Sequence, residues 1–268
     1  MSLSPADRLD QLLDQPRDTA FITPDRTEYQ QAVTLFAQSL SNPAAGDLPQ
    51  AWSALGFAME EAVAGQIWAV RDTRKRGGGL YLFRKQGHLC MQIPHRFFDR
   101  HTGVIGLELF RAGPFRAAAW NTSSRKVHAH GTTTKADLAR FPGAFFQAFH
   151  EAWLNRDAGR IIQIHGYARG KRKSAAGRKA HIILSSGAQF PLAFVRDGAQ
   201  ALQKAGFDGV MVFGDGVFEL GGTTNLQAQS ALKRGRPFLH IELSSETRKI
   251  LTTDPARRQK FLEALSTP

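Results

Sequence analysis

The sequence predicts an α/β protein, in which a mixed β-sheet is flanked by helices and a helical N-terminal region comes first. Three observations lead to this prediction. Apolar residues recur at helical spacing as far as residue 65. From residue 66 onward, short apolar runs typical of strands alternate with amphipathic segments typical of helices. Two early runs follow each other as a hairpin would, so we expect a mixed rather than a purely parallel sheet.

The N-terminal region is expected to be helical over residues 1–65. Proline and glycine separate its three apolar groups. These groups are Leu9, Leu12 and Leu13; then Ala32, Leu35, Phe36 and Leu40; then Trp52, Leu55, Phe57 and Ala58. We expect this region to pack on a main domain, residues 66–268, that carries the sheet.

The main domain is expected to alternate between strands and helices. Strands are predicted at 66–71, 79–84, 88–94, 116–120, 160–166, 180–186, 209–213 and 237–244, the first two joined as a hairpin. Helices are predicted near 104–111, 142–154, 192–205, 226–232 and 246–265. Because ligands bind beyond the carboxyl ends of strands in open α/β sheets, the residues that follow each strand are the functional candidates.

The net charge is unusual for a chain of 268 residues. The chain has 35 Lys+Arg against 23 Asp+Glu, a formal charge of +12, which favours an anionic partner without naming it. The single cysteine, Cys90, cannot form an internal disulfide. The N-terminus lacks the apolar core of a signal peptide, and no apolar window is long enough to span a membrane. We expect a soluble protein, cytoplasmic as the sequence stands, or periplasmic or secreted if a signal peptide was removed.

Two predicted strands end in histidine. The run "CMQIP" is followed by "HRFFDRHTG", which places His95, Asp99 and His101 close together, and "RIIQIHG" ends in His165. A capping or turn pair would explain His95 and Asp99 taken alone. Together with His165, however, they form a His, Asp, His set with an open fourth position, the arrangement of a catalytic zinc site.

A third strand carries a carboxylate among apolar residues. Glu242 lies inside "FLHIELSSETR", where burying its charge is costly unless it meets a cation or takes part in chemistry. Beside a zinc site, such a glutamate would accept the proton of the attacking water and pass it to the leaving amine. The alternative is an ion pair with Arg248 or a lysine at the strand end. The two histidines favour catalysis.

Four segments in this order carry a family resemblance: "PHRFFDRHTG", "QIHGYA", "TTNLQAQ" and "HIELSSETR". Over roughly residues 91–251 the chain resembles the phage poly-gamma-glutamate hydrolase family, a branch of the zinc carboxypeptidase-like amide hydrolases. The resemblance implies a zinc carboxypeptidase-like (phosphorylase/hydrolase-like) fold with Zn²⁺ as cofactor. It also implies zinc ligands at His95, Asp99 and His165, a general base at Glu242, and substrate contacts from Asn225, Gln227 and Arg248.

The second ligand departs from the family pattern. Asp99 stands where glutamate is usual, and its distance from His95 is shorter. Peptidoglycan amidases of the N-acetylmuramoyl-L-alanine type place this ligand further on, where Glu108 would fill the role. The "DRHT" context favours Asp99, and Glu108 is the alternative. His101 is expected to be a supporting or surface group.

The basic residues suggest an acidic substrate. The second of two basic stretches, "ARGKRKSAAGRKAH", follows His165 closely and would concentrate an acidic peptide or polymer near the metal, although a basic loop can also be simply solvated. Arg125 would clamp a substrate carboxylate or cap a helix. Nucleic acid is not favoured, because apart from Tyr167 the stretch has no aromatic residue for base stacking and no nucleic-acid-binding motif is present.

The sequence thus predicts a zinc-dependent amide hydrolase, cleaving a peptide or gamma-glutamyl bond of an acidic peptide-like substrate. It lacks the Gly-x-Ser-x-Gly motif of serine hydrolases, an activated cysteine and a phosphate-binding loop. Two alternatives stay open at this point: a peptidoglycan amidase, and an anion-binding module that keeps the fold without activity.

Overall fold

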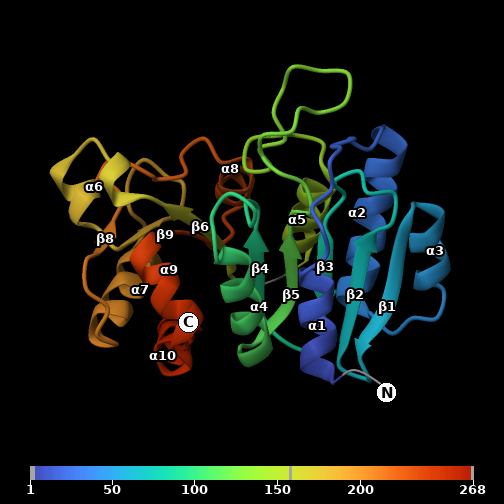
Figure 1. Cartoon of the computed structure of the whole chain (residues 1–268), viewed down its shortest axis with the longest axis horizontal. Helices are drawn as coiled ribbons and strands as arrows, with labels where there is room; N and C mark the ends of the chain where they lie inside the picture. Colours follow the sequence, from blue (N-terminus) through green and yellow to red (C-terminus); the bar gives the residue numbers. More distant parts are fainter. Residues whose placement is uncertain (1–3, 157–158, 267–268) are drawn as a thin grey trace. The chain divides into compact units, whose positions relative to one another are not determined.

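The computed structural model describes residues 4–156 and 159–266. Within them, nine strands and ten α-helices form a mixed sheet flanked by helices, which confirms the predicted α/β class (Figure 1). The strand order is β1-β2-β3-β5-β4-β6-β9-β7-β8. None of the described helices is long and apolar enough to cross a membrane.

The chain forms two compact units. The first comprises Met1–Cys90, Pro94–Phe98 and Phe115–Ala158. The second comprises Met91–Ile93, Asp99–Pro114 and Gly159–Pro268. Strand β4 (Leu89–Ile93) therefore contributes to both. The predicted domain boundary at residue 65 falls inside the first unit, and as a statement about independent domains it stays a prediction.

The first unit joins antiparallel strands to a helical layer. Its other strands are β1 (Phe57–Val63), β2 (Ile67–Asp72), β3 (Leu80–Phe83) and β5 (Phe115–Trp120), and its helices are α1 (Pro5–Leu13), α2 (Arg26–Ser41), α3 (Leu48–Ala54) and α5 (Phe145–Asn155). The pairs β1·β2, β2·β3 and β3·β5 are antiparallel, so the predicted hairpin is confirmed as β2 and β3. Helices α2 and α5 pack together around Phe36, whose ring contacts Trp52 and Phe149.

The expected helical region ends in a strand. Three of its helices are confirmed, but Phe57 and Ala58 lie in β1 rather than in a helix. Gly56, with φ of 81°, turns the chain out of the helical segment, and β1 then pairs with β2. The acidic residues of β1 interrupt the apolar pattern by which a strand is recognised in a sequence. One of them, Glu60, forms an ion pair of 2.5 Å with Arg8 of α1.

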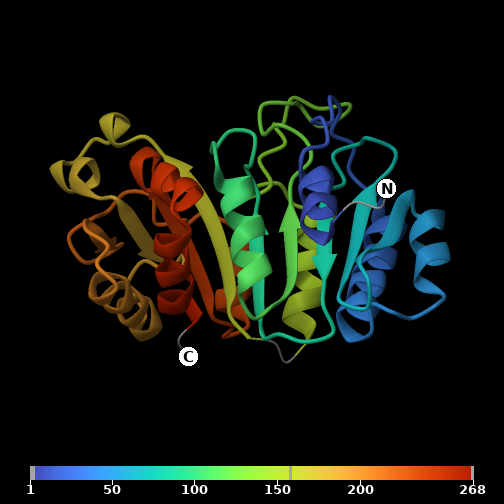
Figure 2. The same cartoon turned by 60° about the horizontal axis from the view of Figure 1, so that its bottom comes forward.

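The second unit carries parallel and antiparallel pairs. Its elements are the rest of β4, α4 (Thr102–Ala112), β6 (Ile161–Tyr167), the 3-10 helix η1 (Arg169–Lys171), α6 (Ala175–Lys179), β7 (Ile182–Ser185), α7 (Ala193–Lys204), β8 (Val210–Val212), α8 (Leu226–Lys233), β9 (Phe238–Ser244), α9 (Ser245–Thr253) and α10 (Pro255–Ser266). β6 is parallel to β9 and β7 to β8, whereas β7 and β9 are antiparallel. Helices α4, α9 and α10 pack together (Figure 2).

Two details of the second unit differ from expectation. The predicted closing helix is two helices, because Asp254 is extended (φ of −117°), as the residue before Pro255 tends to be. The second basic stretch is not simply a loop: it forms η1 and α6, and Ser174 caps α6 by accepting a hydrogen bond from the Gly177 N–H.

The pairing of β6 and β9 brings polar side chains to one face of the sheet. His165 is paired with Glu242 and Gln163 with His240. Because alternate residues of a strand share a face, all four side chains leave the same side. Asn225 and Gln227, at the start of α8, contact Gln163, so α8 covers this face.

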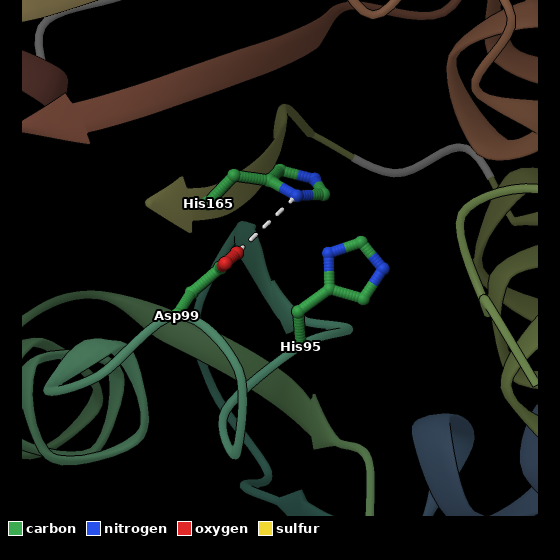
Figure 3. Close-up of side chains that lie close together, drawn as sticks. All are labelled: His95, Asp99 and His165. Carbon is green, nitrogen blue, oxygen red and sulfur yellow. Dashed lines mark ion pairs between the residues drawn. The ribbon is translucent and has the colours of Figure 1, made fainter. Parts of the chain in front are cut away.

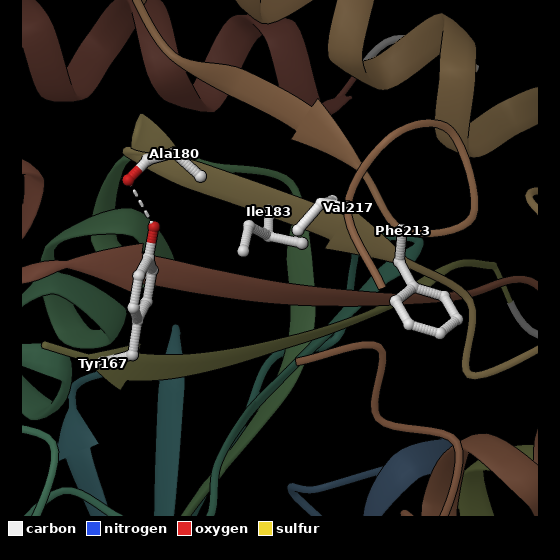
Figure 4. Packing of buried hydrophobic residues seen from close by; sticks show 5 residues of the cluster. All are labelled: Tyr167, Ala180, Ile183, Phe213 and Val217. Carbon is white, nitrogen blue, oxygen red and sulfur yellow. Dashed lines mark hydrogen bonds between the residues drawn. The ribbon is translucent and has the colours of Figure 1, made fainter. Parts of the chain in front are cut away.

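An apolar cluster anchors the chain beyond β6. It consists of Tyr167, Ala180, Ile183, Phe213 and Val217 (Figure 4). The Tyr167 hydroxyl donates a hydrogen bond of 2.6 Å to the Ala180 carbonyl oxygen. This bond joins the end of β6 to the residues just before β7. Both ends of the basic stretch that connects these strands are therefore fixed to the sheet.

Candidate metal centre

Three predicted ligands lie together where β4 and β6 end. Ligand atoms of His95, Asp99 and His165 all lie within 4.8 Å of one another, and the three residues are buried (Figure 3). His95 and Asp99 are on one short turn, in which the Phe98 N–H donates to the His95 carbonyl oxygen. The chain therefore has two imidazoles and one carboxylate grouped as a metal site requires.

Asp99 is held in place from the end of β6. Its Oδ2 accepts a 3.0 Å hydrogen bond from the Gly166 N–H and lies 3.8 Å from His165 Nδ1 (Figure 3). On the other side, the Asp99 carbonyl oxygen accepts from the Thr102 hydroxyl at 2.7 Å. Both contacts fix the carboxylate beside the imidazole.

His95 is oriented by a carboxylate. Its Nε2 lies 2.7 Å from Asp137 Oδ1, and Arg125 donates to Asp137 Oδ2 at 2.5 Å. Burial raises the pKa of Asp137, but the hydrogen bond and charge of His95 and the charges of Arg125 and Arg140 outweigh it and lower the pKa to about 2. An ionised carboxylate can only accept, so in the neutral form of His95, the form that binds a metal, Nε2 carries the proton and Nδ1 keeps the lone pair.

These donors fit a divalent ion such as Zn²⁺. Zinc binds imidazole nitrogen and carboxylate oxygen, and three protein ligands leave a position for water or substrate. His95 Nε2 is engaged by Asp137 and His165 Nε2 by Gln163, at 2.7 Å each. On each histidine, Nδ1 is therefore the ring nitrogen that would bind the ion.

Glu242 lies beside this group on β9. It is 8% exposed, and Oε1 is 3.5 Å from His240 Nε2. Its buried Oε2 has no hydrogen-bond partner among the residues that the structure describes. The His240 ring in turn stacks at 4.5 Å from the ring of His165. A buried carboxylate oxygen without a partner is costly, which is typical of a functional group.

Arg248 lies under the ends of β6 and β9. Its Nη1 donates to the Leu243 carbonyl oxygen at 2.6 Å and to the Tyr167 carbonyl oxygen at 3.3 Å. Burial lowers the pKa of Arg248, opposed by the charges of Asp99 and Glu242. A Cβ on Gly166 would lie 2.0 Å from Arg248 Nη1, so glycine is needed there for close approach rather than for an unusual φ. The predicted substrate contact of Arg248 stays a prediction.

Asn225 and Gln227 bind another side chain. Asn225 caps α8, accepting from the Ala228 N–H at 3.1 Å, and donates from Nδ2 to Gln163 Oε1 at 2.5 Å. Gln227 is fully buried and accepts from Gln163 Nε2 at 3.3 Å. Both thus support the strand that carries His165, and their predicted contact with substrate stays a prediction.

Glu108 and Arg125 are also paired with other residues. Glu108, the alternative ligand, lies on α4 between Arg111 and Arg258, with 3.1 Å to Arg258 Nη2, and it does not belong to the group of three among the described residues. Arg125 is bound to Asp137 and lies 5.1 Å from the Phe98 ring. Its predicted role as a substrate clamp also stays a prediction.

Asp137 and Gln163 were not among the residues that the sequence predicts at the site. Asp137 lies in a long loop, far from His95 in the chain, and no local pattern marks it. Gln163 had a signal: it is a polar residue in an apolar strand, two positions before His165 and therefore on the same face. Gln92 is the equivalent polar residue in β4.

No family model matches the chain, and no curated protein matches it in sequence. Similar solved structures include the N-formylglutamate amidohydrolase of Ralstonia eutropha JMP134, with 12% identity over 67% of this chain and 93% of that one (TM-score 0.45). A metallo-carboxypeptidase of Burkholderia cenocepacia has 11% identity over 69% and 60% (TM-score 0.43). A bacteriophage poly-gamma-glutamate hydrolase has 10% identity over 69% and 86% (TM-score 0.40). At these values the comparisons assign no activity to this chain.

Proposed function

We propose that the protein is a metal-dependent amide hydrolase whose ion is held by His95, Asp99 and His165. The observation that carries the proposal is the grouping of these three side chains within 4.8 Å. The outward hydrogen bonds of both histidines, to Asp137 and Gln163, support it, because a ligating histidine normally donates its other ring N–H to such a partner.

A bound Zn²⁺ supplies Lewis-acid chemistry, polarising a substrate carbonyl and making water a stronger nucleophile at neutral pH. Glu242 would supply the proton transfer. Its Oε2 would take the proton of the attacking water and return it to the departing amine, so that the amine leaves neutral. His240 Nε2 lies 3.5 Å from the other oxygen, Oε1, and leaves Oε2 available for this transfer.

The substrate class that we infer is an acidic peptide or polymer. The basic stretch begins directly after β6, the strand that carries His165. Its positive side chains are Arg169, Lys171, Arg172, Lys173, Arg178 and Lys179. Lys171 and Lys173 are exposed and have no ion-pair partner among the described residues. Exposed positive charge near a site attracts anions from solution and raises the rate of encounter.

The test begins with the metal content of protein purified without a chelator and after incubation with Zn²⁺. We expect about one ion per chain. His95→Asn and His165→Asn should lose it, whereas His130→Asn, an exposed histidine outside the group, should keep it. No divalent ion near unit stoichiometry before or after incubation would contradict the proposal.

Activity is then tested on gamma-glutamyl, alpha-peptide, muramoyl-alanine and N-acyl-amino-acid amides, since pocket shape decides among these bonds. We expect turnover to be fastest on substrates with a free carboxylate. Tight binding of an acidic polymer by the metal-loaded protein, without hydrolysis of any of the four bonds, would instead identify an anion-binding module.

A further inference from the structure

A chain of hydrogen bonds links the N-terminus of α8 to the ring of His165. The Ala228 N–H donates to Asn225 Oδ1 at 3.1 Å. Asn225 Nδ2 lies 2.5 Å from Gln163 Oε1, and the same oxygen lies 2.7 Å from His165 Nε2. All four residues belong to the second unit.

Each link in this chain can run in one direction only. A main-chain N–H always donates, so the Asn225 atom facing Ala228 must be the oxygen. The Asn225 atom facing Gln163 is then the NH₂ group, which donates, and the Gln163 atom that receives it must be the oxygen. That oxygen can only accept from His165, so His165 Nε2 carries the proton and Nδ1 keeps the lone pair.

The other end of the Gln163 amide supports the same orientation. Gln163 Nε2 donates to Gln92 Oε1 at 3.1 Å and to Gln227 Oε1 at 3.3 Å. The amide thus uses both of its donors and both acceptor positions. Because Gln163 is fully buried, turning it over would break all four hydrogen bonds without replacement by water.

We propose that the Asn225 cap of α8 sets the tautomer of His165 through Gln163, and so prepares Nδ1 to bind the metal. This inference rests on the proposed metal site. Asn225 and Gln163 act as positioning residues, since each works through His165. His95 obtains the same tautomer from the carboxylate of Asp137, whereas His165 obtains it from a neutral amide, which needs no counter-charge in a fully buried position.

Two substitutions separate this role from a general effect of charge. Asn225→Asp keeps the cap, because aspartate is as good an N-cap as asparagine, but it removes the donor to Gln163. Gln163→Glu keeps an acceptor for both Asn225 Nδ2 and His165 Nε2. Each variant adds one carboxylate to the same buried network, so each is the matched control for the other.

The tautomer is measured without metal. In protein labelled with ¹⁵N-histidine, at pH 8 where an ordinary histidine is neutral, NMR correlations between ring nitrogens and carbon-bound protons identify the protonated nitrogen. The signals of His165 are assigned by their loss in His165→Asn. We expect the Nε2–H form in wild type and in Gln163→Glu, and loss of that preference in Asn225→Asp.

Zinc affinity, from competition with a chelating dye, is the second readout. We expect about a 10–100-fold loss in Asn225→Asp, typical of removing a partner behind a ligand, and no loss in Gln163→Glu. An added negative charge alone would tighten cation binding in both variants, so the expected loss has the opposite sign. If Asn225→Asp does not fold, Gln163→Met, which removes the oxygen that accepts from His165 Nε2, is expected to show the same loss.

The inference is overturned if His165 keeps the Nε2–H form in Asn225→Asp, or if the two carboxylate variants lose zinc affinity equally. Its failure is distinguishable from failure of the proposed function. Wild-type protein that binds no Zn²⁺ would contradict the metal site, while the NMR measurement on metal-free protein would still decide whether Asn225 sets the tautomer.

Discussion

His165 and Glu242 are paired across the parallel strands β6 and β9, and their side chains leave the same face of the sheet. The residues are far apart in the chain, but this register places a proton acceptor beside a metal-ligand candidate. Glu242 approaches no described lysine or arginine within ion-pair distance; its neighbour at 3.5 Å is His240. The ion pair with Arg248 that the sequence left open is therefore not formed.

Glu242→Gln should abolish most hydrolysis while leaving metal binding intact. Loss of a proton-transfer group typically costs about 10²–10⁴-fold in turnover, and the amide cannot take the proton. Thermal stability should not fall, because the substitution removes a buried charge whose Oε2 has no hydrogen-bond partner within the described residues. The rate constant, zinc content and melting temperature are measured on the same preparation. Full turnover by this variant would exclude Glu242 as the base.

Asp99→Asn should weaken zinc binding more than Glu108→Gln. Asparagine keeps the volume and the acceptor for the Gly166 N–H but removes the negative charge that is proposed to bind the ion. We expect a loss greater than the roughly 10–100-fold that removal of a partner behind a ligand costs. Glu108→Gln should bind zinc as wild type does, since Glu108 is paired with Arg111 and Arg258. The reverse order would identify Glu108 as the ligand.

Gly166→Ala should destabilise the second unit by about 1–3 kcal/mol, the usual cost of forcing extra volume into a packed site. The new Cβ would meet Arg248, which is held by two carbonyl oxygens and cannot move away freely. Gly170→Ala is the control, because nothing lies within 4 Å of its Cβ position. Urea unfolding measures both. In an Arg248→Ala background the cost at residue 166 should largely disappear; if it persists, Arg248 is not its cause.

Protonation of Glu219 at low pH should weaken the hydrogen bonds that hold the basic stretch at Lys173 and Ser174. Hydrogen bonds from the Ser174 hydroxyl and N–H, and from the Lys173 N–H, lower the pKa of Glu219 from 4.5 to about 2. A lowered folded-state pKa means that the stabilisation is complete above about pH 4.5 and is lost as the pH falls through about 2.

Hydrogen exchange at the Lys173 and Ser174 amides measures this effect. At neutral pH, both amides should exchange faster in Glu219→Gln than in wild type, after correction for intrinsic rates. The difference in exchange rate between the two proteins should shrink as the pH falls from 4.5 toward 2, because protonated Glu219 is uncharged, as glutamine is in the variant. A difference that is independent of pH would show that the carboxylate charge does not hold the stretch.

Much of the fold could be predicted because the signals are local. The strands and helices of the second unit, including β6 and β9, could be recognised from the periodicity of apolar residues and from the glycine and proline residues that bound them. The failures have local causes too. Acidic Glu60 and Glu61 interrupt the apolar pattern of β1, and Pro255 divides a pattern that is typical of one long helix.

The α/β class could be predicted from the linear sequence, and so could the candidates His95, Asp99, His165 and Glu242, because strand ends and polar residues within apolar strands are visible in a linear pattern. The hydrogen-bond partners of these residues, in contrast, depend on the folded chain. Asp137 reaches His95 from a long loop, and Asn225 reaches His165 through Gln163. Such contacts depend on strand order, register and donor direction among residues distant in the chain, which no local pattern encodes.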